Sequence, residues 1–289
     1  MIYLDFAAAT PVSGKVMKKM EPYFSDLFFN PSAPYLASKK VREDYENAKS
    51  DLAHTIGAKG ADLVITAGAT ESINLAFTAI NKNAKVLYLA TEHPAVCEAA
   101  SPFNHAEIAV SKTGLIDLQD FKKKLTDDVE LVSVSLANNE LGTIQPLAEI
   151  SALIQKERQR RLAKNITTPI YFHTDASQAL SLVDINVSRL GVDLLTLNAA
   201  KVYGPKGIGA LYISRSVQLQ PIVRGGGQER GLRSGTENVP ALIGFAEAAT
   251  IAKAHLAANR KKYTKLVDTL HIKGAKCPFD LQFLTWDFS

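Results

Sequence analysis

The alternation of short apolar runs with helical segments is the feature that most restricts how this chain can fold. The apolar runs are Leu63–Thr66, Val86–Ala90, Leu131–Leu136, Ile170–His173, Leu194–Leu197 and Ile208–Ile213. Helical periodicity lies between several of them, over Ser72–Ile80, Leu118–Leu125 and Leu147–Ala163. Unbroken apolar strands that alternate with helices predict an α/β fold, with a mostly parallel sheet covered by helices on both faces.

The composition of the 289-residue chain excludes several classes of protein. Its net charge of +4 is dispersed, and the densest basic clusters, Lys122–Lys124 and Lys156–Arg161, fall in helical segments beside acidic residues. Such clusters are typical of solvated helix faces, so we expect no nucleic-acid partner. Two cysteines make no disulfide framework. The chain lacks a basic leader with an apolar core and any apolar stretch of bilayer length, which predicts a cytoplasmic protein without membrane contact.

Ligands of parallel sheets bind where the strands end, so the residues after each apolar run are candidates for a site. The run Leu63–Thr66 is followed by a small, glycine-containing turn that opens a helix, Ala67–Ser72. Free N–H groups and the helix dipole make such a turn a phosphate site, to which the Thr70 hydroxyl adds a donor. An ordinary helix cap has the same pattern.

Three further strand ends carry groups suited to holding an aromatic ring. His93 can stack on a ring, and the consecutive amides of Asn138 and Asn139 can hydrogen-bond ring substituents. Asp175 presents a carboxylate that can hold a protonated ring nitrogen. Taken singly, a surface histidine, an Asx turn and a helix cap explain the same residues.

Lys201 lies where Leu194–Leu197 gives way to a turn rich in glycine and proline, Tyr203–Gly209. An ammonium group against apolar strand ends is poorly solvated, which lowers its pKa toward that of a usable amine, as a Schiff-base lysine requires. An exposed lysine at a strand end is the alternative. Phosphate donors, a stacking ring, amides, an acid and a lysine at successive strand ends are what pyridoxal 5'-phosphate (PLP) requires. We therefore predict a PLP site, with no metal.

The sequence resembles the cysteine desulfurases of the class-V aminotransferase group, which are fold-type I PLP enzymes. The resemblance rests on strings that run in family order across about the first 240 residues. They are YLDFAAATPV at 3–12, FNPSA at 29–33, TAGATESINLA at 66–76, TEHPAV at 91–96, NNELGTIQP at 138–146, HTDASQ at 173–178, KVYGPKGIGALY at 201–212 and GGGQERGLRSGTENV at 225–239.

The resemblance implies a role for each matching residue in the ring-binding part of the site. Lys201 is implied to be the Schiff-base lysine, and His93 the ring-stacking residue and proton carrier. Asp175 is implied to pair with the pyridine nitrogen. Gln178 and Asn139 are implied to contact the ring oxygen or the substrate.

The same resemblance implies a phosphate site shared between two subunits. Ala69 and Thr70 are implied to bind the phosphate, and Thr236 matches the family threonine that reaches the phosphate of the neighbouring subunit, which implies a homodimer. The glycine-rich, basic segment 225–233 is implied to lie near that interface. Just before the lysine the family usually has a small hydroxylic residue, then glycine or serine, then histidine. Here Asn198–Ala200 loses one donor, so we expect weaker PLP binding by about 1 to 3 kcal/mol.

The resemblance also divides the chain into parts. These are an extended arm 1–14, a PLP-binding large domain 15–238, and 239–289 as the start of a truncated α+β small domain. Periodicity predicts helices over Gly14–Phe28 and Ser38–Ile56, and the small domain is expected to begin with helix Val239–Leu270 and strand Leu281–Phe288.

Family members carry the nucleophilic cysteine on a mobile loop in the C-terminal domain, followed by an arginine that grips the substrate carboxylate. Because this chain stops at Ser289, we expect that loop to be absent, and neither Cys97 nor Cys277 lies in its context. We expect neither cysteine to be the low-pKa nucleophile that sulfur transfer needs. Tyr35 stands where the family often has histidine.

The implied function is that of a PLP-dependent cysteine desulfurase, which converts L-cysteine to L-alanine and passes the sulfur to a protein cysteine for iron–sulfur cluster or thio-cofactor assembly. A sulfur-acceptor or scaffold protein is an implied partner, and activity of this chain alone is expected to be impaired. Two alternatives remain. One is a catalytically inactive PLP-binding scaffold or dimer partner, and the other is an aminotransferase or lyase acting on a small amino acid.

Overall fold

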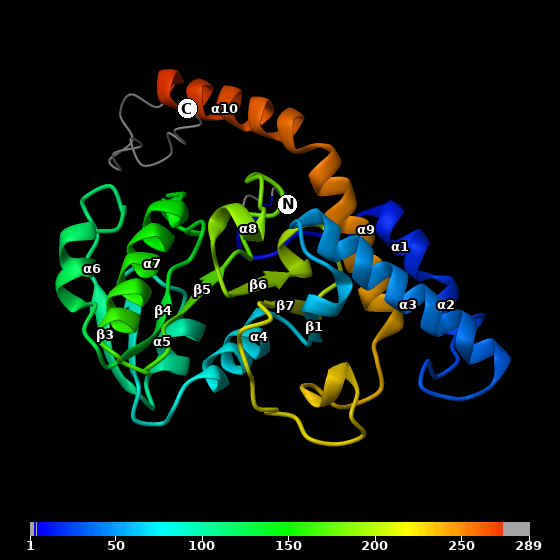
Figure 1. The fold of residues 1–289 in the computed structure, drawn as a ribbon. Coiled ribbons are helices and arrows are strands. Elements are labelled where there is room, and N and C mark those ends of the chain that lie inside the picture. Colours follow the sequence, from blue (N-terminus) through cyan, green and yellow to red (C-terminus); the bar gives the residue numbers. More distant parts are fainter. Residues whose placement is uncertain (1–2, 4, 274–289) are drawn as a thin grey trace.

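The computed structural model describes residue 3 and residues 5–273, within which a seven-stranded sheet forms the centre of the molecule (Figure 1). The strands lie in the order β1-β7-β6-β5-β4-β2-β3. Their bounds are β1 Leu63–Thr66, β2 Lys85–Leu89, β3 Asn104–Ile108, β4 Val129–Ser133, β5 Tyr171–Asp175, β6 Leu194–Asn198 and β7 Gly209–Ile213. Strands β3, β2, β4, β5 and β6 pair in parallel, and β7 runs antiparallel to β1 and β6. The prediction of a mostly parallel sheet is confirmed.

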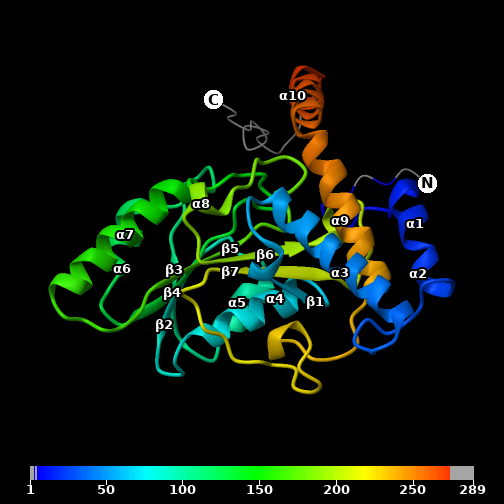
Figure 2. The same cartoon turned by 45° about the vertical axis from the view of Figure 1, so that its right-hand side comes forward.

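Helices cover both faces of this sheet, as the alternating sequence predicted. Apolar side chains of α1, α3, α6, α7, α8 and α9 form one core, and those of α4 and α5 form a second core on the opposite face (Figure 2). The helix bounds are α1 Gly14–Met20, α2 Pro22–Ser25, α3 Leu36–Thr55, α4 Ala69–Ala76, α5 Pro94–Ala100, α6 Leu118–Lys124, α7 Leu147–Ala163, α8 Val187–Leu190, α9 Val239–Ala254 and α10 Leu256–Lys273. Short 3₁₀ turns lie at η1 Gly60–Asp62, η2 Phe77–Ala79, η3 Ala199–Lys201 and η4 Glu229–Gly231.

Three elements differ from the sequence-based prediction. Strand β3 was not predicted, because it lies at the sheet edge and only Ile108 of its five residues is buried. The helix predicted over Gly14–Phe28 is divided at Pro22, which has no N–H to continue α1 and instead begins α2. The helix predicted over Val239–Leu270 bends by 68° at His255, where the buried helix α9 leaves the core.

The C-terminal part of the prediction is only partly within the described residues. Helix α9 packs against α1 and α3 in the main core, and its sequence is apolar on nearly every side. None of residues 256–266 is buried. The strand predicted over Leu281–Phe288 lies outside the described residues, and the domain boundary at 239 stays a prediction.

No single helix among residues 5–273 is long and apolar enough to cross a membrane. Val239–Ala254 and Leu256–Leu266 reach that length only as a pair, across their 68° bend.

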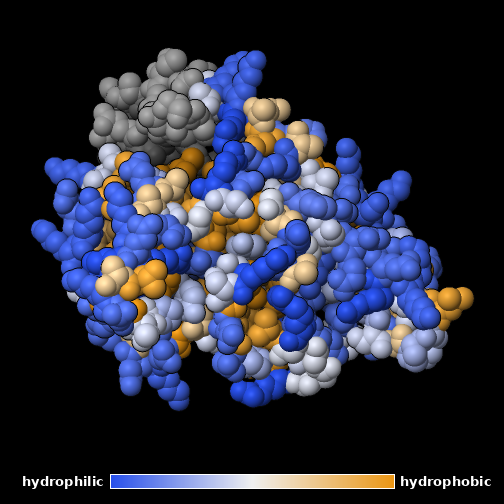
Figure 3. All heavy atoms as spheres, in the orientation of Figure 1, coloured by the Kyte–Doolittle hydropathy of each residue, from blue (hydrophilic) through white to orange (hydrophobic). Residues whose placement is uncertain are grey.

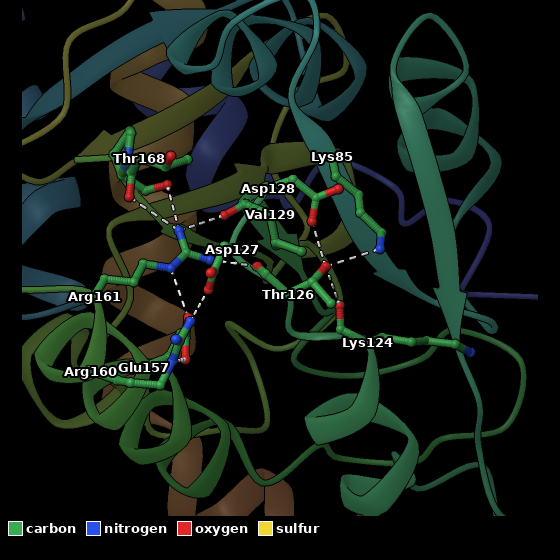
Figure 4. Close-up of polar contacts among 11 residues, drawn as sticks. Lys85, Lys124, Thr126, Asp127, Asp128, Val129, Glu157, Arg160, Arg161 and Thr168 are labelled. Carbon is green, nitrogen blue, oxygen red and sulfur yellow. Dashed lines mark hydrogen bonds and ion pairs between the residues drawn. The ribbon is translucent and has the colours of Figure 1, made fainter. Parts of the chain in front are cut away.

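A buried arginine holds together the amino-terminal end of strand β4. Arg161, on α7, is 2% exposed and donates to the Glu157 carboxylate, at 2.8 Å, and to backbone carbonyls around β4 (Figure 4). These carbonyls are those of Thr126 at 2.8 Å, Val129 at 2.9 Å, Thr168 at 3.2 Å and Pro169 at 3.3 Å. The charge is therefore fully hydrogen-bonded where water cannot reach it.

Candidate active site

A cavity of about 420 Å³ lies at the opposite, carboxyl-terminal edge of the sheet. It is lined by eight of the nine predicted site residues, which are Ala69, Thr70, His93, Asn139, Asp175, Gln178, Asn198 and Lys201. The ninth, Thr236, does not line it. Asn138, which the sequence analysis named as a candidate amide, also lines it. Seven further lining residues were not predicted, and these are Ala7, Ala8, Thr91, Ala95, Ser135, Ala137 and Ser177. The strand-end argument therefore brought together residues that are up to 132 positions apart in the chain.

The first turn of α4 forms one wall of this cavity, through Ala69 and Thr70. No side chain caps the helix, since its N-cap is Gly68 at φ 152° and ψ −179°, a backbone conformation that favours glycine. The preceding turn packs tightly on β7, because a Cβ on Gly209 would come within 2.7 Å of the Gly68 carbonyl carbon. The exposed Thr70 hydroxyl and the amino end of the helix are thus held toward the cavity.

Asp175 is the last residue of β5 and forms part of the cavity floor. Asp175 is 8% exposed, and its Oδ1 accepts a hydrogen bond from the Ser177 N–H at 2.9 Å. Burial raises the pKa of Asp175, while Ser177, His93 and Lys201 act in the opposite direction. A cationic ligand atom placed against this carboxylate would therefore stabilise its charged form.

Lys201 ends the 3₁₀ turn η3 that follows β6, and its ammonium reaches into the cavity. Its Nζ donates to the carbonyls of Ala7 at 2.9 Å and Ala8 at 2.6 Å. Burial lowers the pKa of Lys201, opposed by the charges of Asp175 and Asp5. The lowered pKa is the property that the sequence argument required of a nucleophilic amine.

The N-terminal arm contacts Lys201 through the carbonyls of Ala7 and Ala8. In the sequence, only the family string YLDFAAATPV at 3–12 pointed to a role for this arm. The Ala7 carbonyl also accepts from Gln178 Nε2 at 2.9 Å. Thr10 fixes the arm, since its N–H and its hydroxyl each donate to the Ala200 carbonyl at 3.0 Å and its Oγ1 accepts from the Tyr203 N–H at 2.8 Å. The arm and the lysine turn are therefore one hydrogen-bonded unit.

His93 lines the cavity as the N-cap of α5. Its Nδ1 accepts a hydrogen bond from the Ala95 N–H at 3.1 Å, so in the neutral ring the proton is on Nε2. The ring itself is exposed. Next to it, Asn138 Nδ2 donates to the Thr91 carbonyl at 2.8 Å, and Asn138 Oδ1 accepts from the N–H groups of Glu140 and Leu141. Asn138 is therefore a structural amide, and exposed Asn139 is the one left to face a ligand.

Asn198, Ala199 and Ala200 are the three residues that depart from the family pattern just before Lys201. Asn198 Oδ1 accepts from the Ala200 N–H at 3.1 Å, which leaves its amide nitrogen as the available donor. Ala199 is fully buried in the core. Neither Ala199 nor Ala200 lines the cavity.

Thr236 is exposed on the loop 225–238, away from the cavity. The Glu229 side chain, which is 5% exposed, ties this loop to the body of the molecule. It accepts from Tyr45 OH at 2.6 Å, Lys49 Nζ at 2.7 Å and the Ile65 N–H at 2.9 Å. Glu229 and Arg230 both have a positive φ, of 47° and 61°. The predicted role of Thr236, in the site of a second subunit, stays a prediction.

Cys97 lies on α5 and does not line the cavity. Burial, followed by the charges of Glu92 and Glu107, raises the pKa of its thiol. A raised pKa opposes thiolate formation, so Cys97 is poorly suited to accept sulfur. Cys277 lies outside the described residues.

Buried hydroxyls on the floor provide a test of whether this cavity is built for a ligand. The hydroxyls of Thr91, Ser135 and Ser177 are buried, and none has a hydrogen-bond partner of good geometry among the described residues. Ser135 and Ser177 lie near Glu92 and Asp175. Buried polar atoms are rarely left in this way in a finished structure, so they point to a polar ligand. The donors, the acid, the lysine and the helix terminus fit PLP.

Comparison with known proteins agrees with this geometry. Residues 2–278 match the aminotransferase class-V family. The chain is 39% identical over 280 residues to cysteine desulfurase IscS 1 of Archaeoglobus fulgidus, covering 93% of this chain and 70% of that protein. Two solved structures superpose well. A NifS-like protein gives a TM-score of 0.87 at 30% identity, covering 95% of this chain and 75% of that one. SspA in complex with cysteine gives 0.80 at 33% identity, covering 93% and 78%.

The chain therefore belongs to the class-V aminotransferase family, whose members are PLP-dependent. Within that family it belongs to the cysteine desulfurases.

Proposed function

We propose that this chain binds PLP in the cavity at the carboxyl edge of the sheet and acts on L-cysteine. The observation that carries the proposal is the convergence of Lys201, Asp175 and the first turn of α4 on one cavity. Lys201 would hold the aldehyde carbon, Asp175 would face the pyridine nitrogen, and Ala69 and Thr70 would hold the phosphate. When bound, the cofactor supplies an electron sink for the Cα of an amino acid.

The residues of the chain would prepare this chemistry by holding and moving protons. Asp175, kept from water, gains a cation partner and so holds a proton on the atom that faces it. Lys201 Nζ, with its lowered pKa, can give up a proton after leaving the carbonyls of Ala7 and Ala8. His93 presents an Nε2–H at the open side of the cavity, where it can move a proton to or from the substrate.

The substrate part of the proposal rests on the relatives. Proteins named cysteine desulfurase match most of this chain, and a structure titled as a complex with cysteine shares its fold at 33% identity. Because Cys97 has a raised pKa and lies off the cavity, we propose that the sulfur acceptor is a thiolate outside the described residues. The L-alanine product and a sulfur-acceptor protein are part of this proposal.

The second part of the proposal is a homodimer whose subunits share their sites. Four large apolar side chains are strongly exposed around α2 and the start of α3, at Phe24 (67%), Phe28 (67%), Tyr35 (63%) and Leu36 (82%). Figure 3 shows a small group of apolar atoms at the right-hand edge of the molecule, where Figure 1 places α2 and the start of α3. Ser32, in the same segment, and Arg42 both contact Glu237, the neighbour of Thr236. The exposed aromatics therefore adjoin the threonine that is predicted to serve a second subunit.

A cofactor titration tests the first part. Wild-type protein mixed with PLP should gain the visible absorption of a lysine-bound cofactor, and Lys201→Ala should abolish it. Lys206→Ala, an exposed lysine five residues further along, is the matched control and should bind as wild type does. Absence of the band in folded wild-type protein would disprove the PLP site.

Two further measurements separate the parts of the proposal. Alanine released from L-cysteine is measured with and without an added small thiol, and its release tests whether L-cysteine is the substrate. Transamination or elimination products without sulfur transfer would favour the aminotransferase or lyase alternative. Sedimentation of the wild type and of a Phe24→Ser, Phe28→Ser double variant tests the dimer, which the double variant should dissociate. A wild-type monomer would contradict the shared site.

A further inference from the structure

Two walls of the cavity are tied together behind the residues that face a ligand. One wall is the turn 91–93, which carries His93, and the other is the segment 135–139, which carries Asn139. Glu92 Oε1 accepts a hydrogen bond from the Ser135 N–H at 2.5 Å. The second tie is the bond from Asn138 Nδ2 to the Thr91 carbonyl.

The Glu92 tie replaces a missing strand. Beyond the end of β4, residues 134–136 stay paired with β5 on one side, through the N–H groups of Val134 and Leu136. The strand on the other side, β2, ends at Leu89. The Ser135 N–H points to that side, so without Glu92 it would be a buried donor with no strand to receive it. The carboxylate thus completes the sheet where its backbone stops.

The charge state of Glu92 follows from its surroundings. The residue is 9% exposed, and its Oε2 has no hydrogen-bond partner among residues 5–273. The titratable groups that interact with it are Asp175 at the end of β5 and Cys97 on α5, and the backbone N–H groups of Ser135 and His93 act to lower its pKa. Burial, together with the charge of Asp175, raises the pKa of Glu92 to about 8. We therefore expect Glu92 to carry a proton at neutral pH, which would remove the repulsion between two buried carboxylates.

We propose that Glu92 is a positioning residue, which as a neutral carboxylic acid braces the turn of His93 against the segment of Asn139 and leaves Asp175 as the carboxylate that faces the ligand. This inference rests on the proposed PLP site. Glu92 does not line the cavity, so its proposed role is to position the residues that do.

The first test uses the protein without cofactor, and so does not depend on the proposed function. Thermal melts of wild type and Glu92→Gln are compared from about pH 5 to about pH 9. A carboxyl whose pKa is raised on folding contributes stability at low pH that is lost as the pH rises toward that pKa. The melting temperature of Glu92→Gln should therefore rise relative to wild type up to about pH 8 and stay level above it. Exposed Glu98→Gln, on α5, should follow wild type.

The second test is PLP affinity, measured by absorbance titration at about pH 7 and about pH 9. At the lower pH, Glu92→Gln keeps a neutral acceptor and should bind within about 3-fold of wild type. Glu92→Ala leaves the Ser135 N–H unpaired and should weaken binding by about 10-fold or more. At the higher pH the wild type should bind more weakly than Glu92→Gln, because an ionised Glu92 repels the anionic cofactor. A merely structural role would change affinity without this pH dependence.

The possible failures can be told apart. A constant difference in melting temperature between Glu92→Gln and wild type across the pH range would overturn the neutral state of Glu92. Wild-type affinity in Glu92→Ala, with the site intact, would overturn the brace. Failure of the wild type to bind PLP would refute the proposed function, while the melts would still test the protonation of Glu92.

Discussion

The two edges of the sheet treat buried polar groups in opposite ways. At the amino edge, Arg161 donates to a carboxylate and to four carbonyls, and its charge is fully compensated (Figure 4). At the carboxyl edge, Glu92 Oε2 and the hydroxyls of Ser135 and Ser177 are buried without good partners among the described residues. The first arrangement is complete as it stands, whereas the Ser135 and Ser177 hydroxyls of the second line the cavity, where a bound ligand would meet them. Polar burial alone therefore does not mark a site, and unpartnered hydroxyls point to one only where, like those of Ser135 and Ser177, they line a cavity.

The sharpest test of this contrast is removal of the amino-edge cation. Arg161→Met leaves four backbone carbonyls without their buried donor and leaves Glu157 with only its bonds from the part-exposed Arg160, and breaking a buried ion pair costs about 3–5 kcal/mol. Urea unfolding should show this loss in the free energy of unfolding. Arg160→Met is the control, since that side chain is one-third exposed, and should lose clearly less. An Arg161→Met protein as stable as wild type would contradict the structural role of this edge.

A smaller loss is expected where β7 packs against the turn between β1 and α4. A methyl group on Gly209 would lie 2.7 Å and 2.8 Å from backbone atoms of Gly68, and 2.8 Å from the Leu197 carbonyl. Gly209→Ala should destabilise by about 1–3 kcal/mol and weaken PLP binding, because the phosphate wall must move. Gly14→Ala, where a Cβ has open space, should leave both the stability and the PLP affinity nearly unchanged.

Buried His173 predicts a pH dependence on the acid side. Its Nδ1 lies 2.8 Å from Ser133 Oγ and its Nε2 lies 3.0 Å from Thr196 Oγ1, so one neutral ring bridges β4, β5 and β6. Burial lowers its pKa to about 3. The unfolded chain binds the proton more readily, so stability should fall as the pH drops from about 6.5 toward 3, by up to about 1.4 kcal/mol per pH unit.

Chemical denaturation at several pH values measures that slope. It should be shallower in His173→Gln, whereas exposed His54→Gln should keep the slope of the wild type. Equal slopes in His173→Gln and wild type would show that another group is responsible.

The smallest effect on folding is expected at the cavity floor itself. Ser177→Ala removes a buried hydroxyl that lacks a good partner, so the free energy of unfolding should change by less than about 1 kcal/mol. PLP affinity should nevertheless fall by roughly 10-fold if the hydroxyl serves the ligand. If Ser177→Ala lost much stability but kept its PLP affinity, the carboxyl edge would be a structural edge like the amino edge, contrary to this comparison.

The sequence was informative wherever apolar periodicity was strong. Strand β1 and helix α7 have the predicted bounds, and the helix predicted over Ser38–Ile56 forms as α3, with Val41, Tyr45 and Leu52 buried. Edge strand β3 was not predicted, because Asn104, His105 and Glu107 are polar and the segment lacks an apolar residue at every second position. The bend at His255 depends on where the core ends, which local sequence does not encode.

The site was predictable to the extent that its residues follow strands directly. Asp175 ends β5 and Lys201 lies three residues after the end of β6, so simple topology places them together. Glu92, Ser135 and the arm carbonyls were missed because their importance arises from contacts between distant segments. Glu92 also reads as an ordinary surface glutamate in a turn, and only its burial reveals that it is not.

The position of β7 between β1 and β6 also determines when the cavity can exist. The helix start that would hold the phosphate follows β1, the lysine follows β6, and β7 is the partner that joins these two strands. As the ribosome releases the chain from its amino end, β1 must wait for a strand that is made nearly 150 residues later. We therefore expect that a nascent chain cannot capture cofactor until Ile213 has left the exit tunnel.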